Sequence, residues 1–174
     1  MMVLITGGSG SGKSTFAEGV MMRFAKPYYY VATMLPYGEE AHRRIERHRR
    51  IRAGKGFSTI ERGTDLTGVE FPYGKGAVIL ECVGTLLANE MFEEDGAGKD
   101  AEEAVISGIM HLKDEASDLV IVTNEVGSDG YAYGEETTEY MKILGRINIR
   151  LAKMADAAIE VSGSQPIFLK GAIR

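Results

Sequence analysis

The feature that most constrains this sequence is a glycine- and serine-rich loop between a short apolar run and a segment that can form a helix. The loop covers residues 7–15 (GGSGSGKST), the apolar run precedes it at 2–6, and the helix-compatible segment follows at 16–25. The loop satisfies the pattern G-x-x-x-x-G-K-[ST], which is typical of loops that cradle phosphate groups. A flexible glycine–serine linker is the alternative, but a linker explains neither the preceding apolar run nor the GKST ending.

Each part of this pattern has a chemical reason. Glycines allow backbone N–H groups to turn toward phosphate oxygens, and the N-terminus of the following helix favours the same anion. Lys13 can reach the outer phosphates of a nucleoside triphosphate, and the hydroxyl of Ser14 can bind Mg²⁺. We therefore predict that the nucleotide-binding loop consists of Gly7, Gly8, Ser9, Gly10, Ser11, Gly12, Lys13 and Ser14.

Length and composition limit the classes of protein that fit. A chain of 174 residues with 44% apolar and 26% charged residues is predicted to fold as one domain, 1–174. No apolar run approaches the roughly 20 residues of a transmembrane helix, and the N-terminal segment lacks the pattern of a signal peptide. The net charge of −5 argues against general nucleic-acid binding. The single cysteine, Cys82, excludes an internal disulfide and favours a cytoplasmic location.

Short β-forming runs alternate with amphipathic segments along the chain. Strands are expected at 2–6, 28–33, 57–61, 77–82, 119–123, 157–161 and 166–169. Helices are expected at 13–25, 39–52, 85–94, 100–116 and 135–155. This alternation predicts an α/β fold of the P-loop NTPase type, with a doubly wound, mostly parallel sheet and flanking helices. The ligand site is expected beyond the carboxyl ends of the strands.

The helix expected at 39–52 carries an unusual face. Ala41, Ile45, His48 and Arg52 are spaced by four, three and four residues and therefore share one side of the helix. A neutral imidazole is a competent nucleophile toward phosphorus, and arginines on the same helix could stabilise phosphate charge. A solvated basic face explains the same arginine-rich segment, so the spacing alone leaves both interpretations open.

Glu81 ends the apolar strand expected at 77–82. An acid at the end of a core strand commonly positions Mg²⁺ beside a phosphate-binding loop, directly or through water, so Glu81 and Ser14 are the predicted metal ligands. The alternative for Glu81 is a solvent-facing carboxylate at a strand end. Asn124 and Glu125 also follow a core strand, and the sequence is equally compatible with a site role and with loop capping for both.

Ordered segments over nearly the whole chain resemble the bifunctional adenosylcobinamide kinase/adenosylcobinamide-phosphate guanylyltransferases of cobalamin biosynthesis. The most specific segments are R-I-x-x-H-x-x-x-R at 44–52 and V-T-N-E-V-G at 122–127. The other matching segments lie at 5–8, 11–14, 30–33, 61, 80–82, 145–152, 155–156 and 161–163.

This resemblance implies two reactions on one corrinoid. A kinase step with ATP or GTP converts adenosylcobinamide into adenosylcobinamide-phosphate, and a transferase step then moves GMP from GTP onto that phosphate. His48 matches the histidine that the family guanylylates transiently, and Lys13 is expected to share in the catalysis. The positions that match the family's nucleotide contacts are Ala32, Thr33, Arg49, Arg50, Arg52, Glu61 and Glu81. The family is typically a homotrimer, so the resemblance implies a homo-oligomer.

The chain departs from the family pattern after Gly127. The family commonly continues G-I-V-P, whereas this chain reads SDGYAY at 128–133, and Glu135, Glu136 and Glu139 replace basic residues. These departures could alter corrinoid binding or the kinase half of the enzyme. Three enzymatic interpretations therefore stay open: a bifunctional enzyme, a guanylyltransferase alone, and a plain small-molecule kinase in which His48 is structural. A non-catalytic nucleotide switch is a fourth, although a switch has no need of His48.

Overall fold

The strand that precedes the glycine-rich loop lies inside a mixed β-sheet. The computed structural model describes residues 1–127 and 131–173, apart from the side chains of Arg44 and Ile51. The strands of these residues are β1 (Met2–Thr6), β2 (Tyr28–Ala32), β3 (Phe57–Glu61), β4 (Ala77–Glu81), β5 (Asp118–Val122), β6 (Ala157–Ser162) and β7 (Gln165–Lys170). Their order in the sheet is β3-β2-β4-β5-β1-β6-β7. All neighbours are parallel except β6 and β7, which are antiparallel.

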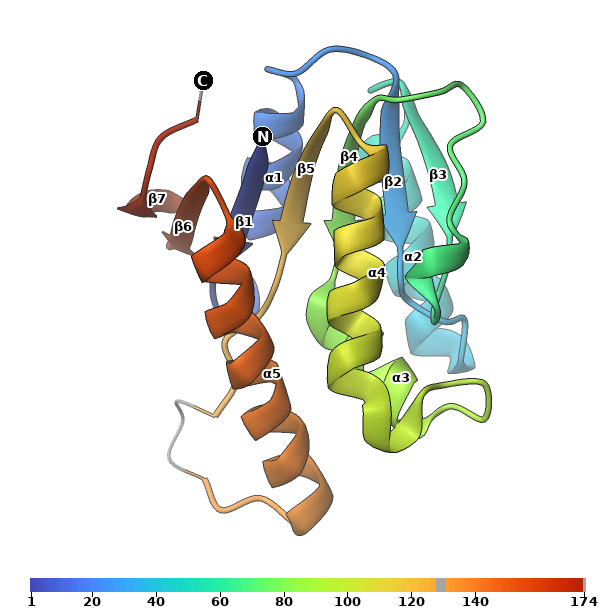
Figure 1. Cartoon of the computed structure of the whole chain (residues 1–174), viewed down its shortest axis with the longest axis vertical. Helices are drawn as coiled ribbons and strands as arrows, with labels where there is room; N and C mark the ends of the chain where they lie inside the picture. The colour runs from blue at the N-terminus through green and yellow to red at the C-terminus, as the bar shows by residue number, and fades with distance from the viewer. Residues whose placement is uncertain (128–130, 174) are drawn as a thin grey trace.

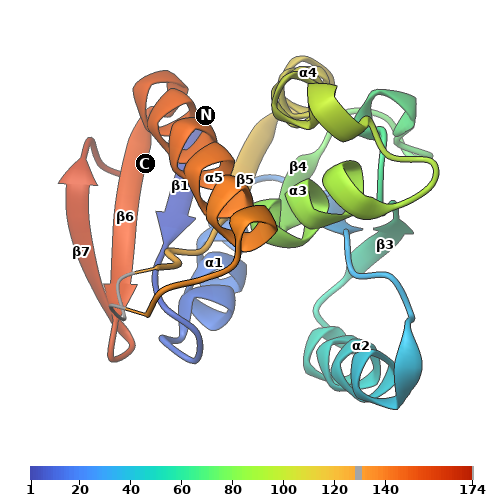
Figure 2. The same cartoon turned by 90° about the horizontal axis from the view of Figure 1, so that it is seen from below.

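Helices cover both faces of this sheet. The α-helices of the described residues are α1 (Lys13–Met21), α2 (Gly38–Arg52), α3 (Val83–Phe92), α4 (Ala101–Glu115) and α5 (Glu135–Met154). Figure 1 shows α4 and α5 in front of the strands, and Figure 2 shows α1 and α2 on one face with α3, α4 and α5 on the other. Strands that are covered on both faces need apolar side chains in both directions. The central strands β1, β2, β4 and β5 meet that need, because almost every residue in them is buried.

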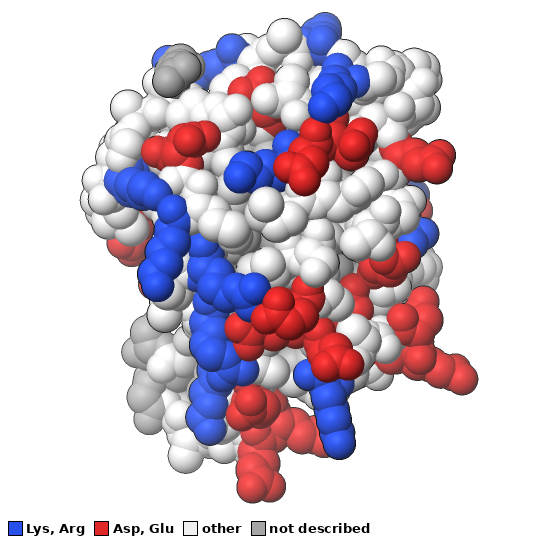
Figure 3. All heavy atoms as spheres, in the orientation of Figure 1, with Lys and Arg blue, Asp and Glu red and all other residues white. Residues whose placement is uncertain are grey.

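The amphipathic pattern at 135–155 forms the long helix α5 as predicted. Leu144, Ile147 and Leu151 are buried on its inner side. Ion pairs tie its outer side to α4, since Arg146 lies 2.7 Å from Glu102 and Arg150 lies 3.2 Å from the same carboxylate. Basic and acidic groups lie next to one another over this face of the molecule (Figure 3).

The structure confirms the predicted α/β class and the alternation of strands and helices, and it corrects the limits of α1 and α3, the latter ending at Phe92 rather than at residue 94. α1 ends at Met21 rather than at residue 25, because Arg23 and Phe24 make only i→i+3 backbone bonds before Pro27. α3 begins at Val83 rather than at residue 85. The Sγ atom of Cys82 accepts a 3.4 Å hydrogen bond from the backbone of Thr85 and so caps the helix two residues earlier.

Two further expectations concern the segment 128–133 and membrane-spanning helices. The departure from the family pattern at 128–133 falls partly outside the described residues, because residues 128–130 are not described. Within the part of the chain that is described, no helix combines the length and the apolar character needed to cross a lipid bilayer.

Two isoleucines on α5 give a matched test of the packing. Ile147 is fully buried, whereas Ile149 is 59% exposed. Ile147→Ala should lower the free energy of unfolding by about 2–5 kcal/mol, because it leaves a cavity in the core. Ile149→Ala should change it by no more than about 0.5 kcal/mol. Urea denaturation of both variants measures the difference, and equal losses would contradict the packing of α5 described here.

Candidate active site

The glycine-rich loop connects β1 to α1 with a backbone that only glycine adopts easily. Gly10 and Gly12 have φ angles of 71° and 92°, in the left-handed region. A Cβ atom on Gly7 would lie 2.4 Å from the carbonyl oxygen of Val161 in β6. The loop is therefore held against the neighbouring strand at a distance that no side chain permits.

The turn between β6 and β7 contacts this loop through a backbone hydrogen bond. Ser164 donates its backbone N–H to the carbonyl oxygen of Ser11 at 2.8 Å. The side chain of Lys13 folds back over the loop and donates to the carbonyl oxygen of Gly8 at 3.0 Å. The ammonium group therefore lies against the loop that is predicted to contact phosphate.

Glu81 lies at the end of β4 and meets the first turn of α1. The hydroxyl of Ser14 donates to Glu81 Oε1 at 2.5 Å, and the hydroxyl of Tyr30 in β2 donates to the other oxygen, Oε2. The Glu81 side chain is only 13% exposed. The predicted metal ligands Ser14 and Glu81 are therefore in direct contact, and the alternative of a solvent-facing Glu81 is wrong.

A second hydrogen-bond network fixes the backbone around Glu81. The hydroxyl of Thr33 lies 3.1 Å from the carbonyl oxygen of Glu81 and accepts from the N–H of Cys82 at 2.9 Å. Asn89 of α3 donates to the carbonyl oxygen of Thr33 at 2.8 Å. Thr33 is buried and makes these contacts with protein atoms. In this structure it therefore holds the backbone of Glu81 and Cys82 in place. Ala32 precedes it at the end of β2.

His48 approaches the same carboxylate from α2. Its Nδ1 atom lies 4.0 Å from Glu81 Oε1, and its side chain is 34% exposed. Arg52, one helical turn later, is only 7% exposed, and its guanidinium lies 3.7 Å from the centre of the Tyr30 ring. The face shared by His48 and Arg52 thus points into the molecule. This orientation favours the phosphate-related interpretation over a solvated basic face.

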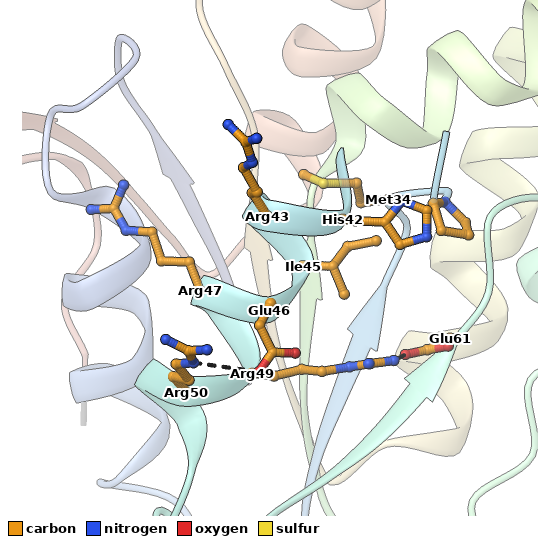
Figure 4. Close-up of a pocket in the computed structure, with 10 residues that line it drawn as sticks. Met34, His42, Arg43, Ile45, Glu46, Arg47, Arg49, Arg50 and Glu61 are labelled. Atoms are coloured by element: carbon orange, nitrogen blue, oxygen red, sulfur yellow. Dashed lines mark hydrogen bonds and ion pairs between the residues drawn. The ribbon is translucent and has the colours of Figure 1, made fainter. Parts of the chain in front are cut away.

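The remaining arginines of α2 point elsewhere. Arg49 donates to Glu61 at the end of β3, and Arg50 pairs with Glu46 on its own helix at 3.3 Å. These four side chains line a cleft of about 790 Å³ beside α2. Figure 4 shows Arg49 reaching across to Glu61, whereas Arg50 projects to the opposite side. The structure therefore does not bring Arg50 to the contact between Glu81 and His48. The side chain of Arg44 lies outside the described residues.

The segment after β5 is held by α5. Thr123 donates to the side chain of Asn148 at 2.7 Å, and Asn148 donates to the carbonyl oxygen of Asn124 at 3.2 Å. Asn124 directs its amide toward Cys82 at 3.9 Å. Glu125 is exposed. The Asn124 amide thus points toward the residue after Glu81, and these contacts leave both interpretations of Asn124 open.

Sequence reasoning missed Tyr30 as a member of the site. Burial, and next the neighbouring Glu81 carboxylate, raise the pKa of the Tyr30 hydroxyl well above its usual range. The hydroxyl therefore stays protonated at neutral pH and remains a hydrogen-bond donor. The strand period gave a partial signal, because Tyr28 and Tyr30 must share one face of β2, but it does not reveal which partner the hydroxyl meets.

A glycine loop on a parallel strand, followed by Lys13 and Ser14 at a helix N-terminus and faced by a strand-end acid, defines a P-loop protein of the NTPase fold class. A solved structure of a prototypical ATPase from the type III secretion system of pathogenic bacteria shares the fold. Its TM-score is 0.53 at 13% identity, over 91% of this chain and 50% of that one.

Sequence comparisons identify a family within this fold class. The sequence profile of the cobinamide kinase / cobinamide phosphate guanyltransferase family matches residues 3–168. The bifunctional adenosylcobalamin biosynthesis protein CobU of Escherichia coli K12 is 33% identical, over 94% of this chain and 97% of the relative. The protein of the same name from Salmonella typhimurium LT2 is 31% identical, over 94% and 97%. The chain therefore belongs to the cobinamide kinase / cobinamide phosphate guanyltransferase family, which confirms the resemblance found in the sequence.

The position of Lys13 predicts a loss of nucleotide affinity when it is removed. Lys13→Ala should weaken GTP binding at least about tenfold, since a hydrogen bond from a charged group contributes roughly 1.5–3 kcal/mol. Isothermal titration calorimetry with GTP measures the change. Lys113→Ala, on the exposed side of α4, is the control and should bind as the unmodified protein does. Equal affinities for both variants would show that the loop does not hold the triphosphate.

Proposed function

We propose that this protein phosphorylates adenosylcobinamide with ATP or GTP and then transfers GMP from GTP to adenosylcobinamide-phosphate through a guanylyl-histidine at His48. The product of the second step is adenosylcobinamide-GDP. Membership of the family supports both activities. The proposal assigns the roles to individual residues of this chain.

One observation carries the proposal. Glu81 Oε1 accepts from Ser14 at 2.5 Å and lies 4.0 Å from His48 Nδ1. A phosphate-binding loop and a candidate nucleophile thus meet at a single oxygen atom. A triphosphate held by the loop extends toward α2, so its α-phosphorus comes within reach of the imidazole.

The transferase step divides one displacement into two. A neutral nitrogen of His48 attacks the α-phosphorus of GTP, the bond to the β-phosphate oxygen breaks, and pyrophosphate leaves. A phosphate oxygen of adenosylcobinamide-phosphate then attacks the same phosphorus, and the phosphorus–nitrogen bond breaks to release His48. Covalent catalysis of this kind replaces one difficult step with two easier ones.

The kinase step uses the same loop in a different way. The hydroxyl of adenosylcobinamide attacks the γ-phosphorus, and the nucleoside diphosphate leaves. Lys13 and the backbone N–H groups of the loop would stabilise charge on the outer phosphates. Ser14 and Glu81 offer oxygen ligands at a half-buried position, which is the donor type that Mg²⁺ prefers. The residues therefore fit the ion, which when bound neutralises charge on phosphate oxygens.

The buried side chain of Arg52 is evidence for an anionic ligand beside α2. The Nε atom of Arg52 is buried and has no hydrogen-bond partner among the described residues. A buried cationic donor without an acceptor is destabilising, and a phosphate oxygen would satisfy it. Arg49 and Glu61 flank the adjoining cleft and are assigned here to the nucleotide outside its phosphates. Arg50 is assigned to the rim of the same cleft.

The assembly and location follow the family resemblance. We propose a homotrimer in the cytoplasm, and the free thiol of Cys82 is compatible with a reducing compartment. Both corrinoid substrates and the nucleotides are small molecules, so neither reaction needs a macromolecular partner.

The guanylyl-histidine predicts a covalent label. Incubation with GTP carrying a radioactive α-phosphate should label the protein, and the adduct should be acid-labile and alkali-stable as a phosphoramidate is. The same GTP labelled at the γ-phosphate should leave no such adduct. His48→Ala should remove the α-label, whereas His111→Ala, on α4 beside the carbonyl oxygen of Val69, should keep it. A label that persists in His48→Ala would refute the role of His48.

A further inference from the structure

Tyr30 contacts two residues of the site, Glu81 and Arg52, through two different parts of its side chain. The residue is 2% exposed in the middle of β2. Its hydroxyl donates to Glu81, and the face of its ring carries the Arg52 guanidinium at 3.7 Å. Phe57 of β3 meets the ring edge-on, with ring centres 5.9 Å apart. The ring is therefore fixed between neighbours and holds its hydroxyl in one place.

The hydroxyl determines how the Glu81 carboxylate is turned. Tyr30 binds Oε2, so Oε1 is the oxygen that faces Ser14 and His48. A half-buried carboxylate with one donor on each oxygen has little freedom to rotate. Loss of the donor on Oε2 would free the group, and both half-reactions depend on Glu81 because both use the nucleotide held by the same loop.

The face of the Tyr30 ring contacts α2, whereas the hydroxyl contacts the end of β4. Arg52 lies one turn after His48 on α2, so seating Arg52 on the ring also sets the position of His48. Two ion pairs also hold this part of the chain, one at Arg49, next to His48 in the sequence, and one beyond the end of α2. Arg49 pairs with Glu61, and just beyond α2 Lys55 pairs with the buried Glu18 of α1. Figure 2 shows α2 at the margin of its layer, beside the sheet edge formed by β3.

We propose that Tyr30 is a positioning residue with two separable tasks. Its hydroxyl aligns Glu81 for both half-reactions, and its ring seats Arg52 and thereby places His48 for guanylyl transfer alone. The inference rests on the proposed function, since it assigns the second task to the guanylyl-histidine step. It concerns a residue that touches neither the phosphate loop nor the imidazole in this structure.

Two substitutions separate the tasks. Tyr30→Phe keeps the ring and removes the hydroxyl, so both half-reactions should slow by roughly tenfold, the effect of one hydrogen bond to a charged group. Tyr30→Leu removes the ring face as well. Guanylylation should then fall by roughly a further tenfold, in line with the loss of a desolvated cation–π contact, while phosphorylation should match that of Tyr30→Phe.

The measurement compares two single-turnover rates in the same preparation. Formation of the His48 adduct is followed with α-labelled GTP, and phosphorylation of adenosylcobinamide is followed with γ-labelled ATP or GTP. The ratio of the rate of adduct formation to the rate of phosphorylation does not depend on the fraction of protein that is folded. Partial misfolding of Tyr30→Leu therefore cannot lower this ratio. Tyr28→Phe is the matched control. Its hydroxyl donates to the carbonyl oxygen of Phe24 at 2.9 Å, outside the site, and both rates should stay within about twofold of the unmodified protein.

The outcomes distinguish this inference from the function on which it rests. Both tasks are supported if both rates fall in Tyr30→Phe while the ratio of adduct formation to phosphorylation stays unchanged, and if that ratio is lower in Tyr30→Leu. Rates in Tyr30→Phe equal to those of Tyr28→Phe, or equal ratios in Tyr30→Phe and Tyr30→Leu, would overturn the inference and leave the proposed function intact. An unmodified protein that forms no adduct would refute the transferase itself, and the second task of Tyr30 with it.

Discussion

The position of the Glu81 carboxylate is the constraint on which the whole site depends. A carboxylate that is only 13% exposed needs hydrogen-bond donors, because burying an unpaired charge is strongly unfavourable. Ser14 and Tyr30 supply one donor to each oxygen, and Thr33 fixes the backbone beneath it. The first turn of α1 therefore cannot move relative to β4 without leaving a buried charged oxygen unpaired. That rigidity is what a site needs if it is to hold phosphate groups at fixed distances.

The strand order explains why these donors meet. Neighbouring strands lie about 4.8 Å apart, so β1 and β4, with β5 between them, are separated by roughly 10 Å. The loop after β1 must therefore carry Ser14 across the end of β5 to reach Glu81, and α1 packs on β4 and β5 as this path requires. β2 borders β4 on its other side and delivers Tyr30. The carboxyl ends of β1 and β4 lie at the same edge of the parallel sheet, whereas Tyr30 lies in the middle of β2, in register with Ile79 and two residues before the level of Glu81.

Some parts of this arrangement follow from the sequence and others do not. The loop 7–15, the strand ending in Glu81 and the helix bearing His48 are visible because each depends on local pattern: glycine spacing, an apolar run and a helical period. The α/β class follows from their alternation. The end of α1 at Met21 was missed because no strong stop signal precedes Pro27, and the start of α3 because cysteine is an unusual helix cap. Tyr30 was missed because its function lies in contacts between strands and helices distant in the chain, and local periodicity carries no information about those contacts.

The same geometry bears on one interpretation that the sequence left open, the plain kinase in which His48 is structural. A plain kinase needs the loop, Ser14 and Glu81, but it has no need of a histidine 4.0 Å from that carboxylate. Nor does it need Arg52 buried one turn later with an Nε atom that finds no acceptor among the described residues. A buried N–H donor without an acceptor reduces stability, so this Nε atom favours a ligand phosphate lying beside α2. A triphosphate placed there presents its α-phosphorus to His48 while the loop holds the β- and γ-phosphates. In the proposed mechanism the loop holds the pyrophosphate that leaves, and α2 carries the attacking group.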